Sequence, residues 1–337
     1  MYTTDDFDIP ILLLITSLTN SYLFRLSVMP IRCKRCRAAL SEIYIPYARL
    51  NLCPDCFLKF YTSKVKRTVE EFKMFRDDDV VGVAVSGGKD SMALLHALKY
   101  GFPKLSLKAL HVNLGIANYS AHCQAKVEKL VESLDVELHI FDLQKEIGIT
   151  IGDFKRTPFK DKLCSVCGTI KRHVFEELAI RAKVKVLATG HNLDDIVAIM
   201  FNNFLYGQWE QLVRLKPVLP PLAEGMAYKV KPLIKCPENE NLLYCLYGNV
   251  PFREMECPFS SGTGVKKKAR IIETAAGDNP YFKHQLLNRF LELIPLLERN
   301  KPQKSFKTCQ ICGFPSLDQI CAYCKRLSLV WRAMGKA

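Results

Sequence analysis

Six consecutive residues, Ser86-Gly87-Gly88-Lys89-Asp90-Ser91, have the types needed to hold phosphate oxygens. Glycines let backbone N–H groups approach an anion closely, the lysine adds a positive charge, and the two serine hydroxyls add donors. The spacing is not the Walker pattern, which requires Gly-x4-Gly-Lys-Ser/Thr. An ordinary turn between a strand and a helix is the alternative, but the whole hexapeptide is more specific than two glycines. We therefore predict that residues 86–91 form a phosphate-binding loop.

A second segment, residues 189–195 with the sequence Thr-Gly-His-Asn-Leu-Asp-Asp, carries two adjacent carboxylates. Beside a phosphate loop, Asp194 and Asp195 would be natural Mg²⁺ ligands or substrate-orienting groups. The alternative is a helix N-terminus with a capping residue and acidic residues in its first turn. Both interpretations hold if the cap faces a ligand. His191 alone is more typical of a structural histidine.

The pair Cys164-x2-Cys167 precedes a predicted helix and is followed by Lys171. Such a pair can be redox-active, half of a zinc site or part of an iron–sulfur site. Lys171 lies one helical turn beyond Cys167 and could offset phosphate charge; otherwise it is a solvated helix residue. Any third ligand must come from the cysteines outside the Cys-x2-Cys pairs, which are usually small buried apolar residues, and the spacing does not choose among Cys123, Cys236, Cys245 and Cys257.

Eight further cysteines form two groups with the spacing of four-cysteine zinc sites. The first is Cys33, Cys36, Cys53 and Cys56, with sixteen residues between its pairs, and the second is Cys309, Cys312, Cys321 and Cys324, with eight. Metal ligation supplies folding energy that such short segments lack. Basic residues crowd the first pair, so this module could also contact RNA; the alternative is a structural module with a solvated rim.

Alternating strand-like and helix-like segments indicate how these residues are positioned. Apolar runs predict strands at 80–85, 105–112, 136–141 and 184–189, and helical patterns lie near 90–100, 119–134 and 169–182. This order predicts an α/β fold with a doubly wound parallel sheet, in which ligands lie at the carboxyl ends of the strands. The nucleotide contacts expected there are Ala84, Ser86, Gly87, Gly88, Lys89, Asp90, Ser91, His111 and Gly190.

The composition limits the classes of protein that the chain can represent. It has 337 residues, 49% of them hydrophobic, and a formal net charge of +14 that suggests a polyanionic partner such as RNA. Cysteines in a large chain without a secretory signal favour metal over disulfides. The apolar stretch 9–18 is too short to span a membrane. Residues before Met29 could be an extra strand, an interfacial segment or, as we favour, an extension upstream of the true start.

The remaining segments complete a provisional division of the chain. Residues 57–76 form a basic, helix-compatible linker, and residues 281–298 an amphipathic helix interrupted by Pro295. The basic run 266–268 is a solvated face or a contact for a phosphate backbone. We expect an N-terminal extension at 1–29, a zinc module at 30–60, a catalytic domain at 61–300 and a second zinc module at 301–330.

Together these residues resemble the tRNA 2-thiouridine synthetases with zinc modules, in the PP-loop superfamily of N-type ATP pyrophosphatases. The likeness covers nearly all of residues 30–330. It rests on the loop 86–91, on Cys164-Ser-Val-Cys-Gly with Lys171 downstream, on residues 190–195, on Glu256-Cys257-Pro258 and on both four-cysteine modules. Members of this family thiolate uridine 34 or uridine 54 of tRNA.

The resemblance implies a reaction and its participants. Cys164, Cys167 and Cys257 would hold a 4Fe–4S cluster with one open iron, and Lys171 and Asp195 would be catalytic. ATP with Mg²⁺ would adenylate the uracil O2, and sulfur from the cluster would then replace it. The implied partners are tRNA and either a ubiquitin-like sulfur carrier or free sulfide. A homodimer and a cytoplasmic location without membrane contact fit the family.

Two alternatives stay open at this stage. In the first, Cys164 and Cys167 act as a persulfide or disulfide relay without iron, and the ATP chemistry is unchanged. In the second, the chain is a non-catalytic, zinc-stabilised RNA-binding protein that uses ATP only as a conformational ligand. The presence of Lys89, Asp90, Lys171 and Asp195 together argues against the second alternative.

Overall fold

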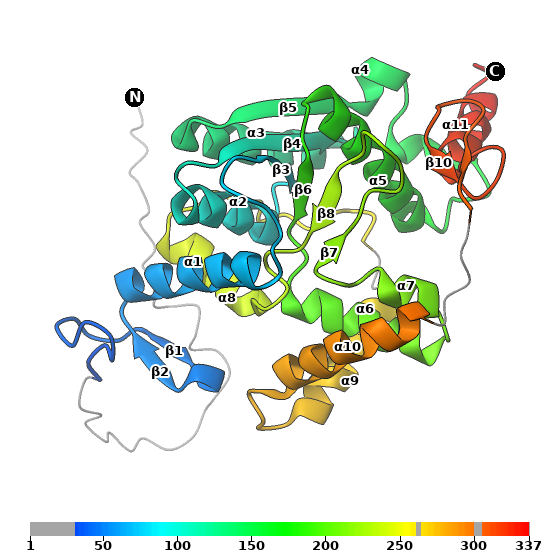
Figure 1. The fold of residues 1–337 in the computed structure, drawn as a ribbon. Helices are drawn as coiled ribbons and strands as arrows, with labels where there is room; N and C mark the ends of the chain where they lie inside the picture. The colour runs from blue at the N-terminus through cyan, green and yellow to red at the C-terminus, as the bar shows by residue number, and fades with distance from the viewer. Residues whose placement is uncertain (1–30, 261–263, 300–304, 337) are drawn as a thin grey trace, which may run out of the picture.

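A six-stranded sheet forms the centre of the molecule and carries the predicted site (Figure 1). The computed structural model describes residues 31–260, 264–299 and 305–336, so the expected N-terminal extension, the side chains of 266–268 and the start of the C-terminal module lie outside the described residues. The strand order is β5-β4-β3-β6-β8-β7. The strands are β3 (Val80–Val85), β4 (Ser106–Asn113), β5 (Glu137–Asp142), β6 (Val186–Thr189), β7 (Val218–Leu219) and β8 (Tyr228–Val230).

The doubly wound α/β fold is confirmed. All neighbouring strands are parallel except β7, which runs antiparallel to β8 at the edge. Each of the four predicted strands is present within two residues of its expected start. The short strands β7 and β8 were not predicted, because strands of two or three residues have too little periodicity to recognise.

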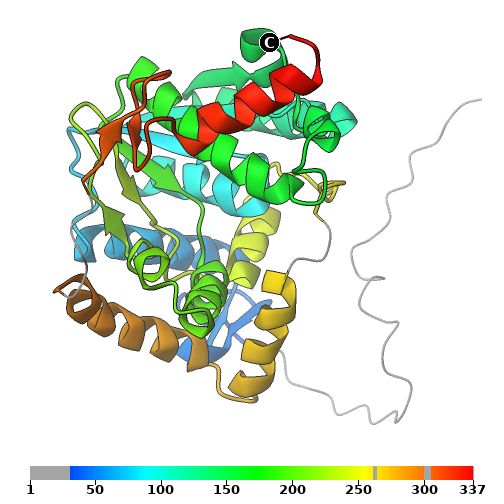
Figure 2. The same ribbon diagram turned by 90° about the vertical axis from the view of Figure 1, so that its right-hand side faces the viewer.

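Helices cover both faces of the sheet (Figures 1 and 2). One face packs against a group of helices whose buried side chains continue the sheet core: α1 (Pro54–Glu71), α2 (Lys89–Gly101), α3 (Ala117–Leu134) and α8 (Glu238–Tyr247). The other face packs against a second group: the 3₁₀ helix η3 (Ile151–Arg156), α5 (Leu163–Arg181) and α11 (Ala322–Ala333). The short helix α4 (Leu143–Ile147) follows β5 directly.

A third core lies beyond the carboxyl end of β6. It joins α6 (Leu193–Leu205), α7 (Trp209–Val213), α9 (Gly264–Ala276) and α10 (Phe282–Arg299). The predicted interruption at Pro295 is wrong, because α10 continues through it to Arg299. Leu287, Phe290 and Ile294 are buried in this core and hold the last turns in place. Among the described residues, we find no helix of the length and apolarity that crossing a lipid bilayer requires.

The two cysteine-rich modules are small and pack on this frame. The N-terminal one contains β1 (Ile43–Ile45), η2 (Pro46–Ala48) and β2 (Leu50–Leu52), and the C-terminal one contains β9 (Lys307–Thr308), β10 (Pro315–Ser316) and α11. The boundary expected between residues 60 and 61 falls inside α1, which belongs to the first module and to the central core. A buried ion pair joins Lys64 of α1 to Glu240 of α8, with 2.9 Å between Nζ and Oε2.

Candidate active site

The site lies where β3 and β6 run side by side, at the carboxyl end of the sheet. The connection after β3 leads to β4 on one side, whereas β6 lies on the other side, and this divergence opens a crevice in doubly wound sheets. The loop 86–91 follows β3 and the segment 189–195 follows β6, as predicted. The amide Nδ2 of Asn192 donates to Oδ1 of Asp90 at 3.0 Å, so the two segments are in direct contact.

The phosphate-type loop is held by its own serines. The backbone N–H of Ser86 donates to Oγ of Ser91 at 3.0 Å, and the Ser91 hydroxyl donates to the carbonyl of Gly88 at 3.0 Å. Gly87 has a φ of +76°, and a Cβ there would lie 2.8 Å from the carbonyl oxygen of Cys123. Glycine is therefore required at position 87, and the loop runs directly into the N-terminus of α2.

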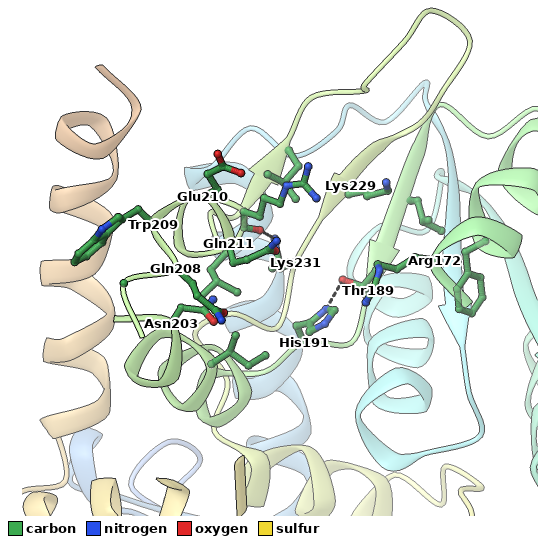
Figure 3. Close-up of a pocket in the computed structure, with 17 residues that line it drawn as sticks. Arg172, Thr189, His191, Asn203, Gln208, Trp209, Glu210, Gln211, Lys229 and Lys231 are labelled. Carbon is green, nitrogen blue, oxygen red and sulfur yellow. Dashed lines mark hydrogen bonds between the residues drawn. The ribbon is translucent and has the colours of Figure 1, made fainter. Parts of the chain in front are cut away.

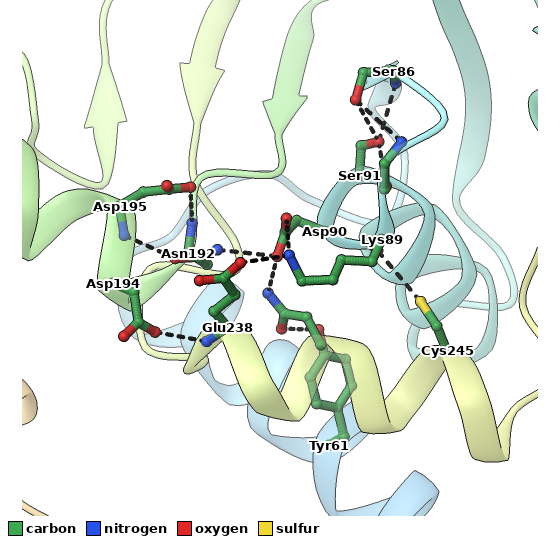
Figure 4. A network of polar contacts seen from close by, with 12 residues as sticks. Tyr61, Ser86, Lys89, Asp90, Ser91, Asn192, Asp194, Asp195, Glu238 and Cys245 are labelled. Atoms are coloured by element: carbon green, nitrogen blue, oxygen red, sulfur yellow. Dashed lines mark hydrogen bonds and ion pairs between the residues drawn. The ribbon is translucent and has the colours of Figure 1, made fainter. Parts of the chain in front are cut away.

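Within this loop, Lys89 and Asp90 belong to a network of polar contacts (Figure 4). Lys89 pairs with Glu238 at 2.6 Å and with Asp90 at 3.3 Å. Partial burial lowers the pKa of Lys89, but the carboxylates of Glu238 and Asp90 outweigh it and leave the pKa raised, so the lysine is charged. Asp90 also accepts from Nδ2 of Asn241 at 2.8 Å, and Oδ1 of Asn241 accepts from the hydroxyl of Tyr61 at 2.6 Å.

The adjacent carboxylates predicted as one feature have different surroundings. Asp194 accepts from the backbone N–H of Glu238 at 2.6 Å and pairs with Lys283 at 2.5 Å. Asp195 closes a capping box with Asn192 at the start of α6, so the capping interpretation holds. Asp195 is exposed, but the protein around it removes part of its hydration. This desolvation and the negative charge of Asp90 raise the pKa of Asp195 to about 7.

The central cysteine pair lies inside a helix rather than before it. Helix α5 begins at Leu163, because Leu163, Val166 and Ile170 form a buried stripe that extends the helix toward its N-terminus. Cys164 and Cys167 therefore lie in the first turns, where the helix dipole favours thiolate charge. The helix start predicted at residue 169 is corrected to 163.

Cys257 comes to this pair from a distant segment. The Sγ of Cys164 donates to the carbonyl oxygen of Phe259 at 3.1 Å, two residues beyond Cys257. Burial raises the pKa of Cys167, and Cys257 and Cys164 raise it further, while Lys171 opposes them. In the described chain, only the two terminal cysteine groups have all sulfurs within 4.8 Å of one another. A wider separation at Cys164, Cys167 and Cys257 suits a multi-iron cluster, whose ligands bind different iron atoms.

A pocket of about 340 Å³ connects the phosphate-type loop to Cys257. Its lining includes Gly88, Lys89 and Asp90 from the loop, together with Arg253 and Cys257. Sequence reasoning missed Arg253, whose backbone N–H donates to the carbonyl of Gly87 at 2.7 Å. The Nε of Arg253 is buried and has no hydrogen-bond partner in the described structure. The available signal was its position four residues before a candidate ligand cysteine.

Lys171, His111 and His191 differ in the contacts that they make. Lys171 is half-buried and makes no hydrogen bond or ion pair with the described residues, yet its charge influences both Cys167 and His191. His111 is buried on β4, and its Nδ1 lies 2.9 Å from the carbonyl oxygen of Val85. Burial lowers the pKa of His111, which favours the neutral ring. Cys123, Cys236 and Cys245 are buried, as expected for structural cysteines.

Both terminal cysteine groups are arranged to bind a metal ion. Within each group the four sulfurs lie within 4.8 Å of one another. In the C-terminal group, the backbone N–H of Cys321 donates to Sγ of Cys309 at 3.3 Å, and that of Cys324 donates to Sγ of Cys321 at 3.4 Å. Hydrogen bonds from backbone N–H groups stabilise thiolate ligands, and four converging sulfurs fit tetrahedral metal ligation.

The fold and this loop define a PP-loop protein. Residues 61–254 match the family described as PP-loop domain, and residues 32–58 match the N-terminal LIM domain of 2-thiouridine synthetase TtuA. The chain is 33% identical over 296 residues to tRNA-5-methyluridine(54) 2-sulfurtransferase of Pyrococcus horikoshii, covering 86% of this chain and 93% of the relative. It therefore belongs to the PP-loop family of tRNA 2-sulfurtransferases.

The likeness to two further proteins covers similar shares of the chains. The Thermus thermophilus tRNA-5-methyluridine(54) 2-sulfurtransferase is 32% identical, over 90% of this chain and 93% of the relative. The solved U34-tRNA thiolase of Methanococcus maripaludis, which contains a 4Fe–4S cluster, superposes with a TM-score of 0.70 at 26% identity. That superposition covers 88% of this chain and 96% of the thiolase, so the likeness includes nearly the whole molecule.

Proposed function

We propose that this protein catalyses the ATP-dependent 2-thiolation of a uridine in tRNA. The observation that carries the proposal is the pocket of about 340 Å³ that is lined both by the phosphate-type loop and by Cys257. A nucleotide bound by the loop would have its phosphates beside the thiols, so activation at O2 and sulfur transfer to C2 could occur on one uracil without its leaving the site.

The proposed reaction has two balanced steps. First, the uracil O2 attacks the α phosphorus of ATP, and pyrophosphate departs with the electrons of the broken P–O bond. Second, a sulfur nucleophile attacks C2, and the C2–O bond breaks to release AMP, which carries the original O2. The backbone N–H groups of the loop, Lys89 and Arg253 would bind the departing pyrophosphate, and Mg²⁺ would share its charge.

The residues present fit an iron–sulfur cluster with three protein ligands. Cys164 and Cys167 lie at a helix N-terminus, and Cys257 reaches them through the Phe259 contact. Cys257 is half-buried beside the nucleotide pocket, unlike the enclosed sulfurs of the structural cysteines. A 4Fe–4S cluster held by Cys164, Cys167 and Cys257 would supply the sulfur for the second step.

Lys171 and Asp195 would both act on the substrate. Lys171, which has no counter-ion in the described chain, would neutralise charge on the adenylated uridine. Asp195 would orient the uridine or Mg²⁺, and it can hold a proton near neutral pH because its pKa is raised to about 7. Ala84, His111 and Gly190, at the strand ends, would contact the nucleotide.

The proposal extends to the other components. We assign zinc to both four-cysteine groups, because tetrahedral all-cysteine sites of this spacing are typical zinc sites. We retain the domain division 1–29, 30–60, 61–300 and 301–330, with α1 shared across the second boundary. The basic net charge suits tRNA as the substrate. A ubiquitin-like carrier or sulfide would renew the sulfur, and the protein would act in the cytoplasm, as a monomer or a homodimer.

A thiolation assay tests the function. Anoxically reconstituted protein is incubated with ATP, Mg²⁺, sulfide and unthiolated tRNA, and the RNA is digested and analysed by mass spectrometry. We expect 2-thiouridine in a single fragment, whose sequence assigns position 34 or 54. Thiolation by iron-free protein would instead support the persulfide relay. An absence of both thiolation and pyrophosphate release with an intact cluster would reject the reaction.

A further inference from the structure

A second and larger cavity, of about 990 Å³, adjoins the candidate active site (Figure 3). We propose that this cavity binds the substrate RNA strand beside the reacting uridine, with Arg172 and Arg214 holding a backbone phosphate. This inference rests on the proposed function, because it takes RNA as the substrate. The cavity lies between α5, the turn joining α6 to α7, and the strand β8, and His191 is part of its wall.

Two arginines on the cavity wall lack a counter-ion. Arg172 makes one long side-chain hydrogen bond, 3.4 Å to the hydroxyl of Thr169, and Arg214 makes no side-chain hydrogen bond or ion pair with the described residues. Burial lowers the pKa of Arg172, and the positive charge of Arg214 lowers it further. The two guanidinium groups are therefore close enough to repel each other. A phosphate between two guanidinium groups would remove this repulsion and accept paired hydrogen bonds.

The lysines of the cavity are already engaged, in contrast to the arginines. Lys229 is paired with the buried carboxylate of Glu176. Lys231 donates from Nζ to the carbonyl oxygens of Arg214 and Lys216, at 3.2 Å and 2.6 Å. Lys231 therefore fixes the backbone that carries Arg214. Glu210 is the acidic residue in the described lining, and its carboxylate has an interaction of its own. The arginines and lysines therefore outnumber the acidic residues there.

The remaining wall is suited to a nucleobase. The amide side chains of Asn203, Gln208 and Gln211 lie across the cavity from Arg172 (Figure 3). Amides offer donors and acceptors that match the exposed edges of an unstacked base. Phe204 and Trp209 have about half of their surface exposed and meet edge-to-face with 5.7 Å between ring centroids. Exposed aromatic rings beside cations are typical of surfaces that bind single-stranded RNA.

The cavity is connected to the predicted catalytic residues. His191 lines it, and its Nδ1 lies 2.8 Å from the hydroxyl oxygen of Thr189. His191 is exposed, but desolvation by the protein around it lowers its pKa to about 4, and the charges of Lys231, Lys171 and Arg172 lower this pKa further, so these cations lie near the ring. Arg172 follows Lys171 on α5. The charges of Lys171 and Arg172 both lower the pKa of His191, so a phosphate held by Arg172 would leave the adjoining nucleotide near Lys171.

Binding of an unmodified tRNA transcript to the reconstituted protein tests this assignment. The variants are Arg172→Gln, Arg214→Gln and the double variant, and the control is Arg76→Gln, an exposed arginine just before the amino end of the central strand β3. We expect the double variant to bind tRNA about tenfold more weakly and its plot of log affinity against log salt to be shallower by about one unit. ATP binding and thermal stability should match the unaltered protein.

Other outcomes would overturn the assignment. Unchanged tRNA affinity and salt slope in the double variant would reject it, as would an equal loss in Arg76→Gln or a loss of ATP binding in place of tRNA binding. Photocrosslinking of the unaltered protein to tRNA containing 4-thiouridine needs no variant and should label peptides from residues 203–214. Protein that binds tRNA through these arginines without thiolating it would support the cavity assignment and reject the proposed reaction.

Discussion

Gly190 lies directly against Ser91, so that a Cβ on Gly190 would come 2.9 Å from the backbone nitrogen of Ser91 and 3.0 Å from its Cα. This contact joins the end of β6 to the first turn of α2. Both contacting atoms belong to the main chain and cannot rotate away. The spacing between the phosphate-type loop and the segment 189–195 therefore depends on the absence of a side chain at residue 190.

Replacement of Gly190 by alanine should separate these segments. We expect Gly190→Ala to lose about 1–3 kcal/mol of stability and to bind ATP more weakly, because the added methyl group overpacks the loop. Thermal unfolding and ATP titration measure the two effects. Gly101→Ala is a suitable control, since its new Cβ would be no closer than 3.5 Å to the side chain of Thr62 at the other end of α2. Equal behaviour of the two variants would contradict the prediction.

Loss of Cys257 should remove iron without removing nucleotide binding. We expect Cys257→Ser to abolish the visible absorbance of the reconstituted cluster and thiolation, while ATP affinity stays largely intact. The control is Cys123→Ala, a buried cysteine close enough for the charge of Cys257 to raise its pKa. That variant should retain iron. A fully active, cluster-containing Cys257→Ser protein would reject the proposed ligand set.

Removal of the Arg253 guanidinium should weaken nucleotide binding. Its Nε would lie 3.5 Å from a Cβ on Gly88, and its side chain also covers the ring of Tyr119. We expect Arg253→Gln to bind ATP about tenfold more weakly, because a charge-assisted hydrogen bond to phosphate is lost. Arg253→Lys should recover part of the affinity. Inhibition by pyrophosphate should weaken in parallel, and unaltered ATP and pyrophosphate affinities would exclude the assigned contact.

Asp195 should make the stability of the folded protein depend on pH. In the unfolded chain this carboxyl group ionises near its ordinary pKa of 3.8, whereas the folded protein keeps its proton up to about pH 7. Between these values the folded state binds more protons, so its contribution to the free energy of unfolding falls as pH rises. Asp195→Asn should therefore show a smaller loss of Tm over this pH range. Parallel Tm profiles of the two proteins would disprove the raised pKa.

Loss of a terminal metal ligand should act on stability. We expect Cys309→Ser to release one zinc ion per chain and to lower the Tm, because α11 packs in the core against α5 through this module. Zinc released on treatment with a thiol-modifying reagent can be counted with a chromogenic chelator. An unchanged Tm would contradict a structural role for this group.

Much of the central fold follows from local patterns. β-branched runs mark β3 and β6, and the glycine-rich loop and the acidic segment occur where those strands end, so the strand-end rule brings them together without knowledge of any contact. The terminal cysteine groups were predictable for a similar reason, since ligand spacing within a short segment already specifies a tetrahedral site.

The parts that sequence reasoning missed depend on contacts between distant segments. Arg253 reaches the loop through a backbone hydrogen bond to Gly87, and nothing in the irregular stretch around it marks that approach. Spacing alone could not select Cys257, because its neighbourhood with Cys164 arises from a contact spanning 95 residues. The cavity near Arg214 lies between the short strands β7 and β8 and a helix of five residues, which are too short for recognisable periodicity.

The residues that form the hydrogen bonds around Asp90 are synthesised at very different times. Asn241 lies 151 residues after Asp90, and it is itself held by Tyr61, which was made 180 residues earlier. In a growing polypeptide the phosphate-type loop is thus complete, and Asn192 is available to Asp90, before α8 emerges and adds the hydrogen bond from Asn241. Translation products that stop before α8 therefore lack the support that Asn241 gives to Asp90.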